Sequence, residues 1–497
     1  MPEQSSTQVP STPSPVPQDL ISVSRHTVTL SSGERLEYTA RAGTVVLREE
    51  AEKDGISEGL KPKATLFFTA YTRDGVSDLA SRPITFCFNG GPGSSSVWLH
   101  LGLFGPRRVE MDPEGFPLAP PYRLLENEYT LLDHTDLVFI DPVSTGYSRA
   151  VDGAKASEYH GFKRDLEAVG EFIRLYTSRN GRWLSPKFLA GESYGTTRAA
   201  GLAGYLQERH GLYFNGLMLI SSILDFGTAL FTPGNDLPHA LFLPTFTATA
   251  FYHGRLPSDL QGDLQTALRE SEAFAMGEYT LALMRGDALE DAERAEIARR
   301  LARLTGLSEA YLERVNLRPE IHRFVKELLR DQGRTVGRLD SRFTGFDRDA
   351  GGEHNEFDPS MSAIMGPYTA SMNHYVRADL GFESDLPYEI LTGRVQPWSY
   401  AEHQNRFVNV AETLRKAMSM NPHLKVLVAN GYYDLATPYF ATEYTMNHLG
   451  VDRSLRGNLS MTYYEAGHMM YIQLAALEAL KQDLAEFIGR SAGVSLS

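Results

Sequence analysis

The sequence predicts an α/β protein with a mostly parallel central sheet, because of its hydrophobic pattern and the loops that interrupt it. From residue 84 onward, short and almost continuously apolar runs alternate with stretches compatible with helices. Strands of this kind are typical of a parallel sheet covered by helices on both faces. Each run ends in a loop that contains glycine or aspartate. The predicted strands are Ile84–Phe88, Leu137–Ile140, Phe188–Ala190, Leu217–Ile220, Val426–Ala429 and Leu459–Tyr464.

The N-terminal part of the chain has a different pattern. Residues 1–20 repeat proline and serine, which predicts a flexible tail. Between His26 and Tyr71, residues with high strand propensity alternate around the turn at Ser31–Glu34. This alternation predicts antiparallel hairpins that precede the parallel strands.

The strand signal lapses between residues 230 and 395 and then resumes. We therefore expect a core made of residues 21–229 and 396–497, with a helical insertion of residues 230–395 between its two parts. Charged residues dominate 290–304, which predicts a helix face in contact with solvent. In an α/β protein, ligands bind at the carboxyl ends of the strands, so we expect the insertion to lie there as a cap.

Composition excludes several kinds of partner. Asp and Glu number 62 against 48 Lys and Arg, a net charge of -14, which argues against nucleic-acid binding. The single cysteine, Cys87, excludes an intrachain disulfide framework, and its place within a strand predicts a packed core thiol. No apolar run is long enough for a bilayer, so we expect no membrane association. No signal peptide is visible, which favours a cytoplasmic location. No residue spacing is typical of a metal site, and we expect neither metal nor cofactor.

The segment Gly191-Glu192-Ser193-Tyr194-Gly195 is the strongest motif. It follows a predicted strand and precedes a stretch compatible with a helix. This G-x-S-x-G pattern is typical of the nucleophile elbow of the α/β-hydrolase fold, in which a sharp turn exposes the serine hydroxyl. We predict Ser193 as nucleophile and the N–H of Tyr194 as one donor of an oxyanion hole.

A glycine-rich loop, Asn89-Gly-Gly-Pro-Gly-Ser-Ser-Ser96, follows the first parallel strand. The α/β-hydrolase fold places the second oxyanion donor in a loop upstream of the elbow, and we expect it to be Gly91. The alternative is a tight loop that caps the next helix through its serines. A phosphate-binding loop is less favoured because no G-K-[ST] follows.

The acid and the base of this fold come after the serine in chain order. Asp434 lies just past the strand at 426–429, and His468 lies past the strand at 459–464. We predict that His468 is the base and that Asp434 orients it. Asp141 is the main competitor for the acid, but it precedes the serine.

Together, these motifs resemble the serine carboxypeptidase family, peptidase family S10. The marker segments are Asn89-Gly-Gly-Pro-Gly-Ser-Ser, Gly191-Glu-Ser-Tyr-Gly and Ala466-Gly-His, in the family's order. The resemblance implies hydrolysis of C-terminal peptide bonds of a peptide substrate, with Ser193, Asp434 and His468 as the triad. It also implies that Gly91 and Tyr194 form the oxyanion hole, and that Asn89 and Glu192 hold the substrate's terminal carboxylate.

The chain departs from the family pattern in three respects. Familiar members have tryptophan where this chain has Cys87, glutamate where it has Leu103, and several disulfides, of which it can form none. It looks more like a bacterial branch. An esterase or aminopeptidase that uses the same residues is the second reading, and a catalytically silent binding scaffold is the third. The sequence does not define the oligomeric state or the preferred side chain.

Overall fold

A computed structural model describes residues 16–493 of the chain, and one large sheet forms its centre. The sheet has ten strands in the order β1-β2-β3-β7-β4-β9-β10-β13-β14, and β8 pairs with β3. Every neighbouring pair from β7 to β14 is parallel. The three neighbouring pairs β1–β2, β2–β3 and β3–β7 are antiparallel. The strands are β1 (Leu20–Thr29), β2 (Arg35–Lys53), β3 (Ile56–Arg73), β4 (Ile84–Phe88), β7 (Asp136–Ile140), β8 (Arg149–Ala150), β9 (Lys187–Ser193), β10 (Gly216–Ser222), β13 (Lys425–Gly431) and β14 (Leu459–Tyr464).

The predicted mostly parallel sheet with antiparallel N-terminal hairpins is therefore confirmed. Each predicted apolar run forms a strand, and every residue of β4, β7 and β10 is buried. Helices cover both faces, which explains why these strands lack the alternation of a half-exposed sheet. Cys87 lies fully buried in β4, as expected of a core thiol.

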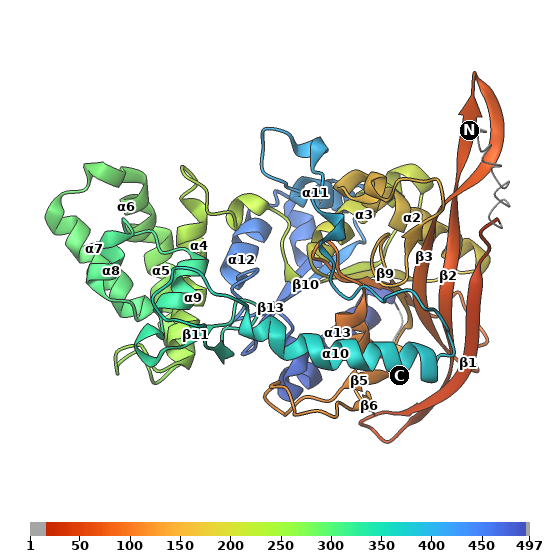
Figure 1. Cartoon of the computed structure of the whole chain (residues 1–497). Helices are drawn as coiled ribbons and strands as arrows, with labels where there is room; N and C mark the ends of the chain where they lie inside the picture. Colours follow the sequence, from red (N-terminus) through yellow and green to blue (C-terminus); the bar gives the residue numbers. More distant parts are fainter. Residues whose placement is uncertain (1–15, 494–497) are drawn as a thin grey trace, which may run out of the picture.

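The antiparallel strands are longer than the sequence pattern predicts. β2 is one strand of 19 residues, and it pairs along its length with β3. Figure 1 shows this hairpin projecting beyond the rest of the sheet. Residues 1–15 of the predicted tail lie outside the described residues. Residues 16–20 lead into β1, and Asp19 Oδ1 accepts a hydrogen bond from the N–H of Val46 at 2.8 Å.

Two layers of helices enclose the sheet. Residues of α2 (Phe162–Arg179), α3 (Tyr194–His210) and α11 (Ala411–Met420) share one hydrophobic cluster with the strands. Residues of α10 (Pro359–Ala378) and α13 (Leu474–Ala492) share a second cluster, on the other face.

A group of helices follows β10 and has a hydrophobic cluster of its own. This cluster takes in buried residues from Ala240 to Val336 and meets the core through Tyr433–Ala441. The helices lie together at the left of Figure 1, far from the long strands β1–β3. They are α4 (Leu237–Tyr252), α5 (Leu264–Phe274), α6 (Thr280–Arg285), α7 (Asp291–Thr305), α8 (Glu309–Arg314) and α9 (Ile321–Glu327).

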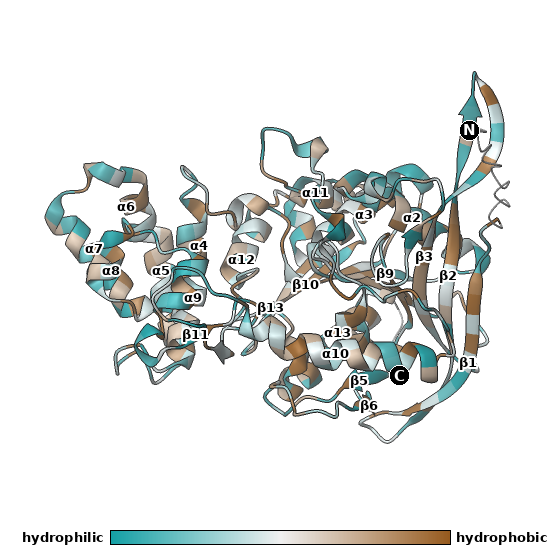
Figure 2. Cartoon of the chain, in the orientation of Figure 1, coloured by the Kyte–Doolittle hydropathy of each residue, from teal (hydrophilic) through white to brown (hydrophobic). Residues whose placement is uncertain are grey.

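The charged helix α7 has the character that its sequence predicts. Its buried residues are confined to a stripe near its C-terminal half, and the rest of it is coloured mostly hydrophilic in Figure 2. A capping box joins Glu290 and Glu293 at its start, satisfying two backbone donors that the helix leaves free.

The second half of the predicted insertion packs differently from the first half. Side chains between Leu339 and Ile390, including those of α10, belong to the cluster that covers the sheet. The short strands β11 (Thr335–Val336) and β12 (Thr344–Gly345) lie at the transition. The division of the chain at residues 230 and 395 stays a prediction, and the packing divides that segment near residue 336.

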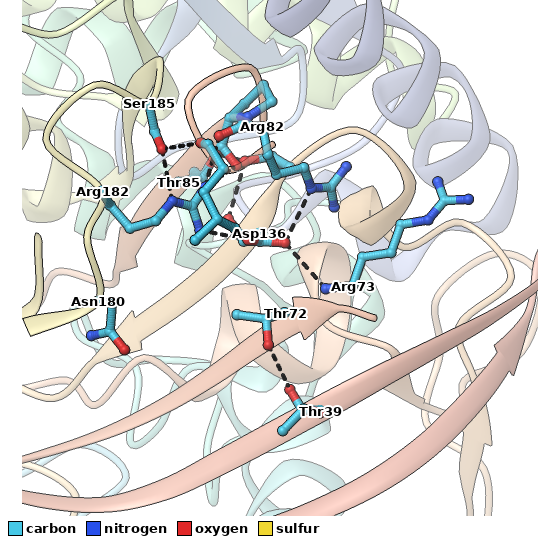
Figure 3. A network of polar contacts seen from close by, with 12 residues as sticks. Thr39, Thr72, Arg73, Arg82, Thr85, Asp136, Asn180, Arg182 and Ser185 are labelled. Carbon is cyan, nitrogen blue, oxygen red and sulfur yellow. Dashed lines mark hydrogen bonds and ion pairs between the residues drawn. The ribbon is translucent and has the colours of Figure 1, made fainter. Parts of the chain in front are cut away.

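A buried ion-pair network ties together the amino ends of three parallel strands. Asp136, the first residue of β7, accepts hydrogen bonds from Arg82 Nε at 3.1 Å and from Arg182 Nη1 at 2.6 Å (Figure 3). Arg82 lies just before β4 and Arg182 lies shortly before β9. Both guanidinium groups also donate to backbone carbonyls, so the network stabilises the segments that lead into these strands.

Candidate active site

Ser193 stands at the turn between β9 and α3, in a backbone conformation that L-residues rarely adopt. Its φ is 59° and its ψ is -130°. The flanking glycines make this turn possible, because a Cβ on Gly191 would lie 2.2 Å from the carbonyl oxygen of Gly195. On Gly195 it would lie 2.7 Å from the carbonyl oxygen of Phe88. The turn therefore presents Ser193 at the carboxyl edge of the sheet, as a nucleophile elbow does.

Asp434 and His468 meet at the same edge. His468 Nδ1 lies 2.7 Å from Asp434 Oδ2, and both side chains are buried. Asp434 is held from three further directions: its Oδ1 accepts the N–H groups of Ala436 and Thr437, and its Oδ2 accepts the Thr437 hydroxyl at 2.6 Å. Burial opposes a charge on His468, but the charge and hydrogen bond of Asp434 outweigh it and raise the histidine's pKa. An imidazole held in this way is a stronger base.

Ser193 and His468 line one cavity of about 210 Å³. Among residues 16–493, no hydrogen bond joins the Ser193 hydroxyl to His468, so the structure brings these two side chains into one cavity without closing that contact. In enzymes without bound substrate, the hydrogen bond between nucleophile and base is often long, and it shortens when substrate binds.

Asp141, the competing acid, lies elsewhere. Its carboxylate accepts the N–H and hydroxyl of Ser96 at 2.8 and 2.7 Å and the hydroxyl of Tyr388 at 2.8 Å. Burial raises its pKa to about 6. These contacts anchor the end of the Asn89–Ser96 loop, and the partner of His468 is Asp434.

The two residues expected to form an oxyanion hole belong to segments that pack on each other, and Gly91 lines the same cavity as Ser193. Gly90 packs so closely on the elbow that a Cβ there would lie 2.4 Å from the nitrogen of Tyr194. Tyr194 is the first residue of α3, so its N–H has no acceptor within the helix. Within residues 16–493, the N–H of Gly91 donates to no protein group. Arg198 of α3 fixes this loop by donating to the carbonyl of Asn89 at 2.5 Å.

Glu192 and Asn89 lie at the back of the site. Glu192 is 3% exposed and accepts a hydrogen bond from the Tyr471 hydroxyl. Burial raises the pKa of Glu192 to about 7, although the proximity of His468 and the bond from Tyr471 act to lower it. Asn89 Oδ1 accepts the N–H of Leu99, and its buried amide faces Glu192, where it helps to lower the pKa of that carboxyl group.

Leu103, at the position of the family's second acid, is fully buried within the hydrophobic cluster of α10 and α13. The ring of Tyr471 packs on the neighbouring Gly102, where a Cβ would lie 2.4 Å from it. Tyr471, and not a second carboxyl group, is therefore the polar neighbour of Glu192.

Sequence reasoning missed three contributors to this site. They are the hydroxyl of Thr437, the hydroxyl of Tyr471 and the segment 337–342, whose residues Arg338 and Leu339 line the cavity. None of them belongs to a motif. Thr437 bonds Asp434 locally, three residues along the chain, whereas Tyr471 and the segment 337–342 reach their partners through tertiary packing. The cavity takes five lining residues from the predicted insertion, all from its second half: Arg338, Leu339, Met361, Ile364 and Leu391. The helices α4–α9 contribute none of the residues that line it.

The fold is that of the α/β-hydrolases. The crystal structure of Kex1(delta)p, a prohormone-processing carboxypeptidase from Saccharomyces cerevisiae, covers 91% of this chain and 91% of its own with a TM-score of 0.54 at 15% identity. A proline iminopeptidase from Mycobacterium smegmatis covers 94% of this chain and 99% of its own with a TM-score of 0.34 at 11% identity.

Residues 55–230 match the family described as serine carboxypeptidase. The pheromone-processing carboxypeptidase KEX1 of Saccharomyces cerevisiae is 33% identical over 161 residues, which are 31% of this chain and 20% of the relative. The chain thus spans a fifth of the length of the curated relatives it matches. The resemblance to the serine carboxypeptidase family, expected from three motifs, is confirmed over the segment that contains two of them.

Within residues 16–493, no cluster of three or more His, Cys, Asp or Glu side chains could hold a metal ion. No helix in that range is both long and apolar enough to cross a bilayer.

Proposed function

We propose that this protein is a serine-type carboxypeptidase that hydrolyses C-terminal peptide bonds through an acyl-enzyme on Ser193. The observation that carries the proposal is the pair of His468 and Asp434, 2.7 Å apart, in the cavity that Ser193 lines at its strained turn. The serine carboxypeptidase match over residues 55–230 supports the same activity.

In this mechanism, Ser193 attacks the carbonyl carbon of the last peptide bond while His468 takes its proton. His468 then gives the proton to the leaving amine, and a water molecule repeats the cycle to release the acyl group. Asp434 holds the histidine tautomer and stabilises the imidazolium that forms. The N–H groups of Gly91 and Tyr194 donate to the oxyanion of each tetrahedral intermediate.

Glu192 and Asn89 hold the terminal carboxylate of the peptide. A buried carboxyl group beside the nucleophile opposes the charge of the intermediate, so it suits a substrate that itself brings a carboxylate with which to share a proton. The pKa of about 7 supports this role, because Glu192 keeps its proton up to neutral pH. The amide of Asn89, which faces Glu192, supplies a donor to the same group. The competing reading is that Glu192 only packs under the elbow and bonds Tyr471.

A second candidate is an esterase or aminopeptidase with the same triad. It is favoured by Leu103, because the carboxylate site then has one acid where familiar relatives have two. A cytoplasmic location belongs to the proposal as well, and the lone buried cysteine supports it, since the chain forms no internal disulfide.

The first experiment tests the nucleophile. A fluorophosphonate probe is expected to label the wild-type protein once, and Ser193→Ala is expected to lose both the label and at least about 10⁴-fold of kcat. Ser419→Ala, on the surface of α11, is the matched control and should label normally. Persistent labelling of Ser193→Ala would remove Ser193 as the nucleophile.

The second experiment separates the two candidate activities. N-blocked peptides with a free C-terminus should be hydrolysed faster than the same peptides as C-terminal amides. Peptides with a free N-terminus should be hydrolysed no faster than their N-blocked counterparts. KM for the free acid should be lowest at acidic pH and rise as the pH passes about 7, where Glu192 loses its proton. Glu192→Gln should lose this pH dependence, because an amide donates without needing a proton. Parallel pH profiles would exclude Glu192 as the carboxylate reader and favour an esterase or aminopeptidase.

A further inference from the structure

The segment 337–342 is fastened to both loops that carry the proposed acid and base. The carbonyl of Leu339 accepts the N–H of His468 at 2.7 Å, and the carbonyl of Arg338 accepts the N–H of Leu435 at 3.1 Å. On its other side, the N–H of Arg338 donates to Asp358 Oδ1 at 3.1 Å. The backbone at Arg338 is therefore fixed relative to His468 and to the acid loop.

The Arg338 side chain, in contrast, has no polar partner within the described part of the chain. It is exposed and lines the cavity that also contains Ser193, Glu192 and His468. Among residues 16–493, its guanidinium group takes part in no ion pair and no side-chain hydrogen bond, although 31 ion pairs occur in this range, including many arginine pairs. Its charge nevertheless acts on the site, because it is among the causes that lower the pKa of His468.

The groups around Arg338 leave its charge available. Asp358, which accepts the backbone N–H of Arg338, is occupied by further backbone N–H groups and the Ser360 hydroxyl. His322 faces it as well, and burial together with the charge of Arg338 lowers the pKa of this histidine. A five-donor guanidinium group with a fixed backbone, open to a reaction cavity, matches the two oxygens of a carboxylate.

A cation in this cavity would offset the repulsion between Glu192 and a substrate carboxylate. Glu192 is the one acid beside Asn89, and the position of the family's second acid holds Leu103 in the hydrophobic core. When Glu192 ionises, it repels the terminal carboxylate, and only a cation within the cavity can offset that repulsion.

We propose that Arg338 is a specificity-determining residue that binds a carboxylate of the peptide substrate. The carboxylate is either the C-terminal one or that of an acidic side chain beside the scissile bond. This inference deepens the proposed function and rests on it, since it assigns a substrate group to the same cavity.

The test uses binding so that it does not depend on turnover. In a Ser193→Ala background, calorimetry at pH 7.5 gives Kd for four N-blocked peptides: a free acid, its amide, and the same two with glutamate next to the C-terminal residue in place of glutamine. Arg338→Gln is expected to weaken binding of the carboxylate that it reads by about 10-fold relative to the matched neutral peptide, the lower range for a charge-assisted hydrogen bond. Arg338→Lys should restore part of this ratio.

The control variant is Arg334→Gln, four residues earlier, whose guanidinium lies over the Phe346 ring and outside the cavity. It should leave all four Kd ratios unchanged. A change confined to the acid–amide ratio assigns Arg338 to the terminal carboxylate, and a change confined to the Glu–Gln ratio assigns it to the side chain. Unchanged ratios in Arg338→Gln, or the absence of peptide binding altogether, would overturn the inference. Hydrolysis by the Ser193-intact protein decides the proposed function separately.

Discussion

Glu192 combines two properties that oppose each other: it is a carboxyl group, and it is almost completely buried next to the proposed nucleophile. Only its neighbours make the position tolerable. The Tyr471 hydroxyl donates to it, and His468 provides an opposite charge, yet burial still dominates and raises its pKa to about 7. The folded protein therefore prefers the protonated form.

This preference predicts how stability depends on pH. An unfolded glutamate ionises near pH ~4.3, so the stabilisation from protonated Glu192 is complete below that pH and is lost as the pH rises through about 7. Glu192→Gln keeps an acceptor for Tyr471 and never ionises. The free energy of unfolding of Glu192→Gln, relative to that of wild type, should increase by on the order of 3 kcal/mol between pH ~4.5 and ~8.

Urea unfolding at several pH values measures this difference. Glu486→Gln, on the exposed face of α13, is the control and should run parallel to wild type. If the two curves for wild type and Glu192→Gln stay parallel, the carboxyl group does not titrate with a raised pKa, and its role in sharing a proton with substrate is removed as well.

The loop after β14 is positioned by a segment that lies 127 residues earlier in the chain. Asp340 Oδ2 accepts the N–H of Gly467 at 3.2 Å and the Arg342 guanidinium at 2.7 Å, and the carbonyl of Leu339 accepts the N–H of His468. The contact leaves no space for a side chain at position 467. A Cβ there would lie 2.4 Å from Asp340 Cβ and 2.6 Å from its Cα. The glycine before the histidine is thus a packing requirement.

Gly467→Ala is therefore expected to push His468 away from its position while the sheet stays intact. A displacement of about 1 Å at a catalytic group lowers kcat by roughly 100-fold. Steady-state kinetics measures this loss, and circular dichroism checks the fold. Gly457→Ala is the matched control, since nothing lies within 4 Å of its added Cβ. Full activity in Gly467→Ala would show that the segment 337–342 does not position the histidine.

Across the whole molecule, the two edges of the parallel sheet serve different purposes. The site lies at the carboxyl ends of β4, β9, β13 and β14, and the Asp136 network ties the amino ends of β4, β7 and β9 (Figure 3). Removing one member of a buried ion pair leaves the others charged and unpaired, which is costly.

Asp136→Asn should lower the free energy of unfolding by about 3–5 kcal/mol, because two buried arginines lose their counter-charge. Activity at 25 °C should be retained, since the change is at the opposite edge of the sheet. Thermal and urea midpoints measure the loss. Glu34→Gln, which breaks the exposed pair with Arg73, is the control and should cost at most about 1 kcal/mol. Equal effects of the two variants would contradict a structural role for the network.

Much of this protein could be inferred from local patterns in the chain. Apolar runs predicted five of the six parallel strands, because a strand buried on both faces needs a continuous hydrophobic segment. The sixth, β14, is a half-buried edge strand that was predicted from its strand-like residues. The motif around Ser193 predicted the elbow, because Gly191 is required by a contact with Gly195 within the turn itself. Chain order and the end of a strand predicted that Asp434 and His468 would meet, since the ends of parallel strands share one edge.

Other features depended on packing between distant segments. Tyr471 lies 279 residues from Glu192 and carries no motif, yet it is the donor to that carboxyl group. The predicted insertion packs as two parts, because the cluster of α4–α9 ends near Val336 while α10 returns to the sheet. Because the chain packs back onto the sheet after Val336, Arg338 lines the cavity and Asp340 contacts the loop that carries His468. A local pattern records which residues must be buried together, whereas the partner of a side chain hundreds of residues away is defined only when the chain has packed.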